Sequence, residues 1–426
     1  MGNPIQNWLR SLRFKAALNK GHEQEAEKIF REMENSGLKL SALAKLYQKK
    51  QQVEESLTFY KRELASVSNR TNYLSKQEVN YLEPDAEFVN AIRKSFNFLE
   101  SESGKIQCSG VESEVIPKFE ASLANFLDQE LQKIPKNLLE PALQLAVKEI
   151  EALEEVYPVK FQSRLSPYIY FLNRFPQEVY SNYLACFLVY QSGLIPQNIK
   201  ILDLNAGVGS TIYGLFLLLQ SSINFSPLPP VHISYYSLEK NSNLQFRGLQ
   251  FWHKYIEPQP VAANIYLRFD TTDLLSQTEK IGDITPDFFD LIVLAHSFFE
   301  TKDNRLTSHH IYKEIIHKSL ADNGHVLLVI NQQKLSDFYD LQPSEDTEQQ
   351  ENLIHAFVQE LGLQLKWYRY LSSMVRGEED LQHFSAENLS SMTALNSLRQ
   401  KYLEHAVDSN YVIDDYVILA QKKSQE

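Results

Sequence analysis

The fold of this chain is decided by the stretch ILDLNAGVGS, residues 201–210. An apolar run leads into a turn that contains Gly207 and Gly209, and a helical pattern begins at Ser210 and continues to Leu219. Glycine lets backbone amides come close to a ligand, and the N-terminus of the following helix adds positive potential. The stretch therefore predicts a strand, a ligand-binding turn and a helix in succession.

Downstream of this turn, strand-like apolar runs alternate with helical ones. This alternation is typical of an α/β fold with a doubly wound, mostly parallel sheet that helices cover on both faces. We expect this domain to span residues 196–426, with an insertion at 371–410 before the last strand. The predicted strands lie at 199–204, 231–238, 264–269, 289–295, 324–330, 363–370 and 411–421, and the helices at 210–219, 241–255, 308–320 and 351–361.

The residues before this domain are predicted to be all-helical, apart from a linker. Helical patterns fill residues 1–70, loops with one helix at 86–99 are expected in 71–115, and helices return in 116–195 as a lead-in to the sheet. Within 1–70, small residues and aromatics recur 30 residues apart, as Ala26 with Phe30 and Ser56 with Tyr60. This spacing resembles tetratricopeptide-like helical hairpins, which bind protein partners. The alternative is a small helical cap for the next domain.

Charge is distributed unevenly along the 426 residues. The whole chain carries −12, which argues against broad binding to nucleic acid or anionic lipid. Residues 1–70 carry +5, however, and the remainder carries −17. A local contact of the N-terminal helices with an acidic protein or with RNA therefore stays open.

Cysteine content and hydropathy favour a cytoplasmic protein. Cys108 and Cys186 are the only cysteines, too few for a disulfide framework, a four-thiolate zinc site or an iron–sulfur cluster. The N-terminus lacks the apolar run of a secretory signal. No apolar stretch approaches the roughly 18 to 20 residues that span a bilayer, so no membrane span is expected.

Polar residues follow the first three predicted strands of the sheet. Asp203 and the glycine turn follow the first, Glu239 ends the second, and Asp270 with Thr271 ends the third. A carboxylate after the second strand can accept hydrogen bonds from ribose hydroxyls, and polar groups after the third can meet an adenine edge. Because parallel strands end at one edge, these groups predict a site for an adenosine-bearing cofactor.

At these residues the chain resembles the class I S-adenosylmethionine-dependent methyltransferases, over about 196–423. Asp203, Gly207 and Gly209 match that family's motif, and Asn205 stands where its first glycine is usual. The runs 289–294 and 323–329 look like its fourth and fifth strands, and 411–421 like its antiparallel last strand. The resemblance implies S-adenosylmethionine as cofactor, held by Asp203, Asn205, Gly207, Gly209, Glu239, Asp270 and Thr271.

Two other protein classes share features with this sequence. A dinucleotide-binding turn would require Gly-x-Gly-x-x-Gly, whereas Ile212 stands at the third glycine position, so an NAD-dependent enzyme is the less favoured alternative. Residues 165–183, and 296–300 with Arg305, look like the methyltransferase-like proteins that associate with the mitochondrial small ribosomal subunit. That family carries cysteines for an iron–sulfur cluster, which this chain lacks.

The methyl acceptor is not identified by any motif. The Asn/Asp-Pro-Pro-aromatic pattern of amine-directed enzymes is absent after the fourth strand, and neither cysteine follows a strand that could present a thiolate. His296 follows the fourth strand, where a general base would stand, because imidazole takes up protons near neutral pH. The alternative is a histidine that lines the pocket without proton transfer.

A metal site is not predicted. His309, His310 and His317 suggest one, and His310 and Glu314 would lie one helical turn apart, but no third ligand has the spacing of a metal motif beside this pair. The leading hypothesis is thus a methyltransferase with an unidentified acceptor. The alternative is a non-catalytic assembly or scaffold factor that keeps the fold, suggested by Asn205 in place of glycine.

Overall fold

The computed structural model divides the chain into two compact units, Met1–Glu78 and Val79–Glu426. Of the first unit only Lys28 and Ile29 are described, so the expected tetratricopeptide-like hairpins lie outside the described residues. The structure describes residues 28–29, 79–101, 104–155, 161, 163–225, 229–261, 263–274, 284–298, 302–344, 346–373, 389–403 and 408–423.

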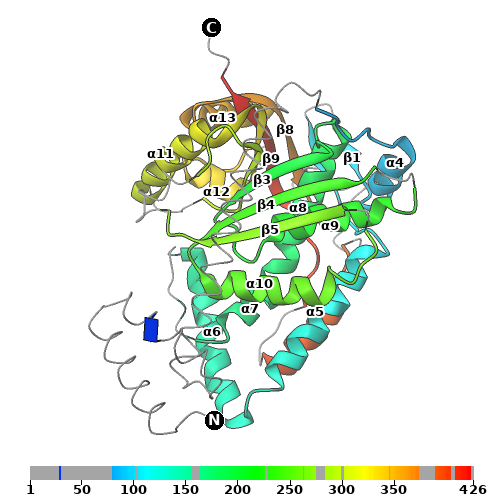
Figure 1. Ribbon diagram of the computed structural model, residues 1–426, viewed down its shortest axis with the longest axis vertical. Helices are drawn as coiled ribbons and strands as arrows, with labels where there is room; N and C mark the ends of the chain where they lie inside the picture. The colour runs from blue at the N-terminus through cyan, green and yellow to red at the C-terminus, as the bar shows by residue number, and fades with distance from the viewer. Residues whose placement is uncertain are drawn as a thin grey trace. The chain divides into compact units, whose positions relative to one another are not determined.

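Within the described residues of the second unit, nine strands form one sheet in the order β1-β2-β8-β9-β7-β6-β3-β4-β5 (Figure 1). The strands are β1 (Leu99–Glu100), β2 (Lys105–Gln107), β3 (Asn198–Leu204), β4 (Val231–Glu239), β5 (Ala263–Thr271), β6 (Phe289–Ala295), β7 (Leu320–Asn331), β8 (Leu363–Ser372) and β9 (Asp414–Lys422).

Strand direction confirms the predicted mostly parallel sheet. β3 pairs in parallel with β4 on one side and with β6 on the other, and β6 pairs in parallel with β7. β9 runs antiparallel to both of its neighbours, β7 and β8. The carboxyl ends of β3, β4, β6 and β7 therefore meet at one edge, next to the beginning of β9.

Side chains alternate between the two faces of the sheet, as period-two strands require. In β3, Ile201 belongs to one hydrophobic core and Leu202 to the other, and in β6 Val293 and Ile292 divide in the same way. Both faces are buried, which explains the nearly continuous apolar runs of these strands.

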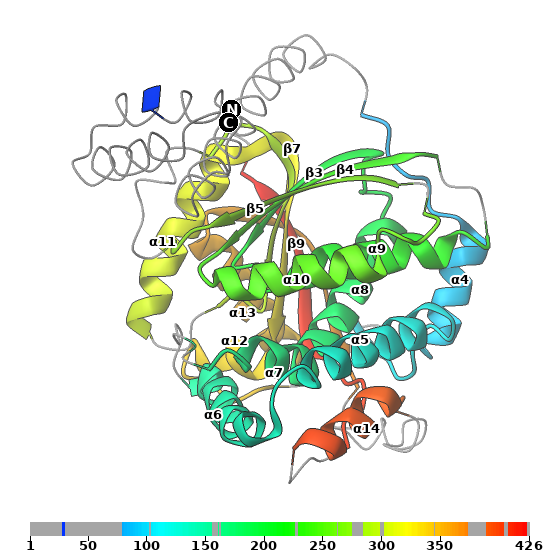
Figure 2. The ribbon, with the colours of Figure 1, turned by 60° about the horizontal axis from the view of Figure 1, so that its bottom comes forward.

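Each core is closed by its own set of helices (Figure 2). One set of helices covers the face of the sheet that carries Ile201, and the other set covers the face that carries Leu202. On the first side lie α4 (Ala86–Ser95), α5 (Val115–Leu131), α6 (Lys136–Glu155), α7 (Ser166–Asn173), α8 (Phe175–Gln191), α9 (Ser210–Ser222), α10 (Ser242–Tyr255) and α14 (Thr393–Tyr402); on the second lie α11 (Lys302–Ser319), α12 (Gln332–Asp337) and α13 (Thr347–Glu360).

The segment 71–115, expected to be a linker, contributes two short strands to the sheet. β2 pairs in parallel with β8, with Lys105 opposite Tyr370, and β1 pairs antiparallel with β2. In the expected insertion, α14 is anchored at its N-terminus, where the Glu120 carboxylate accepts hydrogen bonds from the backbone N–H groups of Ala394 and Leu395 at 2.7 and 3.2 Å. β1, β2 and α14 therefore belong to the packed second unit.

A close approach at Gly248 positions the turn after β3. A side chain at this position of α10 would place its Cβ 2.3 Å from the carbonyl oxygen of Val208. Only glycine lets the helix backbone lie directly against the turn. Among the helices that the structure describes, none is long and apolar enough to cross a membrane.

Candidate functional site

A cavity of about 740 Å³ opens at the carboxyl edge of the sheet. Its walls come from the ends of β3, β4, β6 and β7, the beginning of β9 and the helices α7 and α8. Among the predicted site residues, it is lined by Asp203, Asn205, Gly207, Glu239 and His296. Folding thus brings together residues that lie up to 93 positions apart, from Asp203 to His296.

The turn after β3 repeats a left-handed backbone conformation at alternate residues. φ is 54° at Asn205, 56° at Gly207 and 88° at Gly209. Glycine adopts this region freely, and asparagine is one of the few other residues that tolerate it. Asn205 therefore keeps the backbone shape that glycine would give. Gly209 lies just outside the cavity lining and caps α9.

The Glu239 carboxylate fastens this turn to the end of β4. Its Oε2 accepts a hydrogen bond of 2.9 Å from the N–H of Gly207, and its Oε1 accepts one of 2.7 Å from the N–H of Asn241. Burial raises the pKa of Glu239, and these backbone donors oppose the rise. The backbone N–H of Lys240 also lowers the pKa, and a carboxylate with about four lone-pair sites can still accept a hydrogen bond from a further donor.

Asp203 is a buried acid under the same turn. Its Oδ2 accepts a hydrogen bond of 2.6 Å from the Tyr235 hydroxyl. Burial raises the pKa of Asp203 to about 7, although the hydrogen bond from Tyr235 lowers it. This carboxyl group therefore changes its protonation state near neutral pH.

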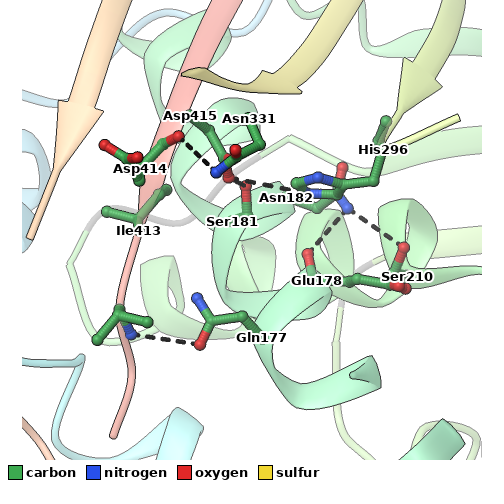
Figure 3. Close-up of polar contacts among 12 residues, drawn as sticks. Gln177, Glu178, Ser181, Asn182, Ser210, His296, Asn331, Ile413, Asp414 and Asp415 are labelled. Carbon is green, nitrogen blue, oxygen red and sulfur yellow. Dashed lines mark hydrogen bonds and ion pairs between the residues drawn. The ribbon is translucent and has the colours of Figure 1, made fainter. Parts of the chain in front are cut away.

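His296 occupies the first position after β6 and is held there by its backbone. Its φ is 53°, and its N–H donates to the carbonyl oxygen of Val329 at 2.8 Å. Its Nε2 is buried without a hydrogen-bond partner and lies 3.8 Å from Oδ2 of Asp415, which accepts a hydrogen bond of 2.7 Å from Ser181 (Figure 3). The structure thus places a carboxylate beside the candidate base.

Helix α8 lines the cavity with Gln177 and Glu178, which the sequence analysis did not identify as site residues. Asn182 donates to the carbonyl oxygen of Glu178 at 2.9 Å and to Oγ of Ser210 at 3.2 Å, and Gln177 accepts from the N–H of Val412 at 3.2 Å (Figure 3). One weak pattern in the sequence could have indicated these residues. Polar residues recur inside a helix whose other residues are mostly apolar and buried.

Acidic groups outnumber basic ones around the cavity. The basic side chains are Arg174, Lys240 and Lys334, and Lys240 forms an ion pair with Asp273 at 2.6 Å. Such a wall favours a ligand that carries positive charge. The acidic side chains are Glu178, Asp203, Glu239, Asp414 and Asp415.

Two further predicted cofactor residues, Asp270 and Thr271, do not line this cavity, like Gly209. The carbonyl oxygen of Asp270 accepts a hydrogen bond of 3.1 Å from Gln245, and the Thr271 hydroxyl donates to Gln245 at 2.9 Å. Both residues therefore hold α10 against the end of β5. Residues 275–283, which follow in the sequence, lie outside the described residues.

The cysteines and the histidines of α11 lie apart from the cavity. Burial raises the pKa of both Cys108 and Cys186 to about 12, so neither supplies a thiolate at neutral pH. His309 packs against Phe298 and Phe357. No cluster of three or more histidine, cysteine or carboxylate side chains suited to a metal ion occurs in the part of the chain that the structure describes.

No protein-family model and no curated protein sequence matches the chain. Similar solved structures include a SAM-dependent methyltransferase from Methanosarcina mazei, which is 14% identical with a TM-score of 0.31 and covers 54% of this chain and 95% of its own. The mitomycin 7-O-methyltransferase MmcR is 10% identical with a TM-score of 0.33, covering 70% and 72%. The plantazolicin methyltransferase BpumL, in complex with SAH, is 14% identical with a TM-score of 0.31, covering 70% and 100%.

Proposed function

We propose that this protein is an S-adenosylmethionine-dependent methyltransferase. The observation that carries the proposal is the left-handed turn 205–209, which opens on the cavity beside the buried carboxylate of Glu239. A sheet with an antiparallel β9 between β7 and β8 also agrees with the class I arrangement that the sequence resembles.

The residues at the turn fit such a cofactor. The Glu239 carboxylate would accept a further hydrogen bond from a ribose hydroxyl, and the backbone of 205–209 would hold the amino-acid part close to the N-terminus of α9. The acidic wall suits the positive sulfonium. When bound, S-adenosylmethionine supplies an electrophilic methyl group. In this proposal Gly209, Asp270 and Thr271 also contact the cofactor.

The residues of this chain would hold the two reactants in place and accept a proton. The molecule that receives the methyl group would lie between α8 and the beginning of β9, next to His296. His296 would take the proton that an oxygen or nitrogen acceptor loses, and the neighbouring Asp415 carboxylate would stabilise the imidazolium. Most of the acceleration would come from holding the reactants in line.

A non-catalytic scaffold factor remains the competing proposal. Its sequence argument was Asn205 in place of glycine, and the φ of 54° at that residue means that the substitution preserves the shape of the turn. A protein or RNA partner for residues 1–70 and a cytoplasmic location stay predictions.

A transfer assay separates the two proposals. The purified chain is incubated with methyl-labelled S-adenosylmethionine and a cell extract, and label is counted in the protein, RNA and small-molecule fractions. We expect label in one fraction with the wild type and with Glu257→Gln, an exposed control on the segment after α10. We expect none with Glu239→Gln. Label in no fraction would favour the scaffold.

A further inference from the structure

A chain of hydrogen bonds joins the turn after β3 to the loop after β6. Nδ2 of Asn205 donates to the hydroxyl of Tyr312 at 2.7 Å, and that hydroxyl donates to the carbonyl oxygen of Ser297 at 2.8 Å. Tyr312 lies in α11 and is 1% exposed. Its hydroxyl therefore bridges two cavity-lining loops from inside the second hydrophobic core.

The loop after β6 is also tied from its other side. The hydroxyl of Ser297 lies 2.9 Å from the carbonyl oxygen of Leu204, the last residue of β3, and 2.8 Å from that of Ala295, the last residue of β6, so its one proton can be donated to either strand end. His296 precedes Ser297 and holds the left-handed φ of 53°. Histidine adopts this conformation more often than most residues, but for any residue other than glycine it still costs about 1 to 3 kcal/mol and persists only where the surrounding structure holds it.

We propose that Asn205, acting through Tyr312, is a positioning residue that fixes the His296 loop relative to the turn after β3. The consequence for methyl transfer depends on the proposed function, but the coupling of the two loops does not. Glycine at position 205 would supply the same backbone conformation without an N–H donor for Tyr312. The side chain of Asn205 thus has a use that a glycine could not serve.

The direction of the hydrogen bonds makes the amide specific. The Tyr312 hydroxyl has one proton, which it donates in the hydrogen bond to the carbonyl oxygen of Ser297. The side chain at position 205 must therefore donate to the oxygen of that hydroxyl. Asn205→Asp keeps the size and the tolerance for positive φ but offers only an acceptor. It would compete with Ser297 for the same proton and leave one buried oxygen unsatisfied.

Amide hydrogen exchange, followed by mass spectrometry at the peptide containing His296, tests the proposal. The His296 amide is bonded to Val329, so its exchange reports opening of the loop. Asn205→Gly, Asn205→Asp and Tyr312→Phe are each expected to speed exchange at this peptide about tenfold, the equivalent of one hydrogen bond. The matched control is Tyr213→Phe, because the buried Tyr213 hydroxyl also donates to a carbonyl oxygen at 2.8 Å, that of Gly248, away from the loop.

The outcomes separate this proposal from the proposed function. Exchange at the His296 peptide that is as slow in all three variants as in the wild type overturns the coupling. Faster exchange spread equally over the whole unit also overturns it, because that indicates general destabilisation. If Tyr312→Phe does not fold, Asn205→Gly, which keeps the backbone unstrained, decides alone.

Binding of S-adenosylhomocysteine supplies the second readout. The Tyr312→Phe variant, at a residue that does not line the cavity, is expected to bind it within threefold of the wild type, while the rate of label transfer falls about tenfold. A wild type that binds no S-adenosylhomocysteine refutes the proposed function, and the exchange comparison on the ligand-free protein still decides the coupling.

Discussion

The Oε2 of Glu239 accepts a hydrogen bond of 2.9 Å from the backbone N–H of Gly207, so that a side chain from the end of β4 fixes the turn after β3. The Oε1 of the same carboxylate accepts from the N–H of Asn241 at 2.7 Å. One buried group therefore shapes both loops that flank the proposed ribose position. This arrangement makes the turn sensitive to any change in the acceptor capacity of Glu239.

Glu239→Gln is expected to weaken binding of S-adenosylhomocysteine by more than about tenfold. A glutamine side chain has a single acceptor oxygen, so its NH₂ group would face the N–H of Gly207 or of Asn241, at a cost of one buried hydrogen bond or more. Isothermal titration measures the effect, with Glu257→Gln as the control. Equal affinity in both variants would show that Glu239 does not organise the site.

Gly248→Ala is expected to destabilise the protein by about 3 kcal/mol. The added Cβ would lie 2.3 Å from the carbonyl oxygen of Val208, so α10 would have to move away from the turn. Urea denaturation measures the free energy of unfolding. His253→Ala, at an exposed position of the same helix, is the control and should change it by less than about 0.5 kcal/mol. A small effect of Gly248→Ala would mean that α10 is not packed tightly on the turn.

The buried acid Asp203 predicts a specific pH dependence of stability. Burial raises its pKa to about 7 in the folded state, against 3.8 for the ordinary side chain. The folded state therefore keeps this proton to higher pH than the unfolded state does. Proton binding by Asp203 stabilises the folded state fully below pH 4, and this stabilisation is lost as the pH rises through 7.

Asp203→Asn removes this titration and keeps an acceptor for the Tyr235 hydroxyl. The free energy of unfolding of the variant relative to the wild type should rise between pH 4 and pH 7, by up to about 4 kcal/mol, and then level off. Denaturation at a series of pH values measures this difference. A difference that stays constant with pH contradicts the raised pKa.

His296→Asn is expected to lower the rate of label transfer about 100-fold without loss of S-adenosylhomocysteine binding. Asparagine tolerates the φ of 53° but does not take up a proton at neutral pH. The labelled-methyl assay and isothermal titration measure the two quantities on one preparation. Transfer at the wild-type rate would mean that His296 lines the pocket without accepting a proton.

The sheet was predictable because its strands are long, buried on both faces and separated by helices. The predicted strand 289–295 coincides with β6, and 199–204 differs from β3 by one residue at its start. β1 and β2 were missed because strands of two and three residues are too short to show a period. β2 becomes a strand only through its pairing with β8.

The sequence allowed the cavity residues at the strand ends to be predicted, but not those contributed by the helices. The strand ends at Asp203, Glu239 and His296 could be placed together because parallel strands end at one edge. Asp415 and Ser181 are 234 residues apart, and nothing in their local sequence indicates that they meet. Contacts of this kind depend on how α8 packs against β9, which periodicity does not determine.

Titration calorimetry of the wild type with S-adenosylhomocysteine shows whether the turn 205–209 and Glu239 bind S-adenosylmethionine. We expect saturable heat with one site per chain, a stabilised thermal transition, no competition from NAD and an affinity more than about tenfold weaker in Glu239→Gln. Absence of both heat and thermal shift at millimolar S-adenosylhomocysteine would show that this site does not bind the cofactor.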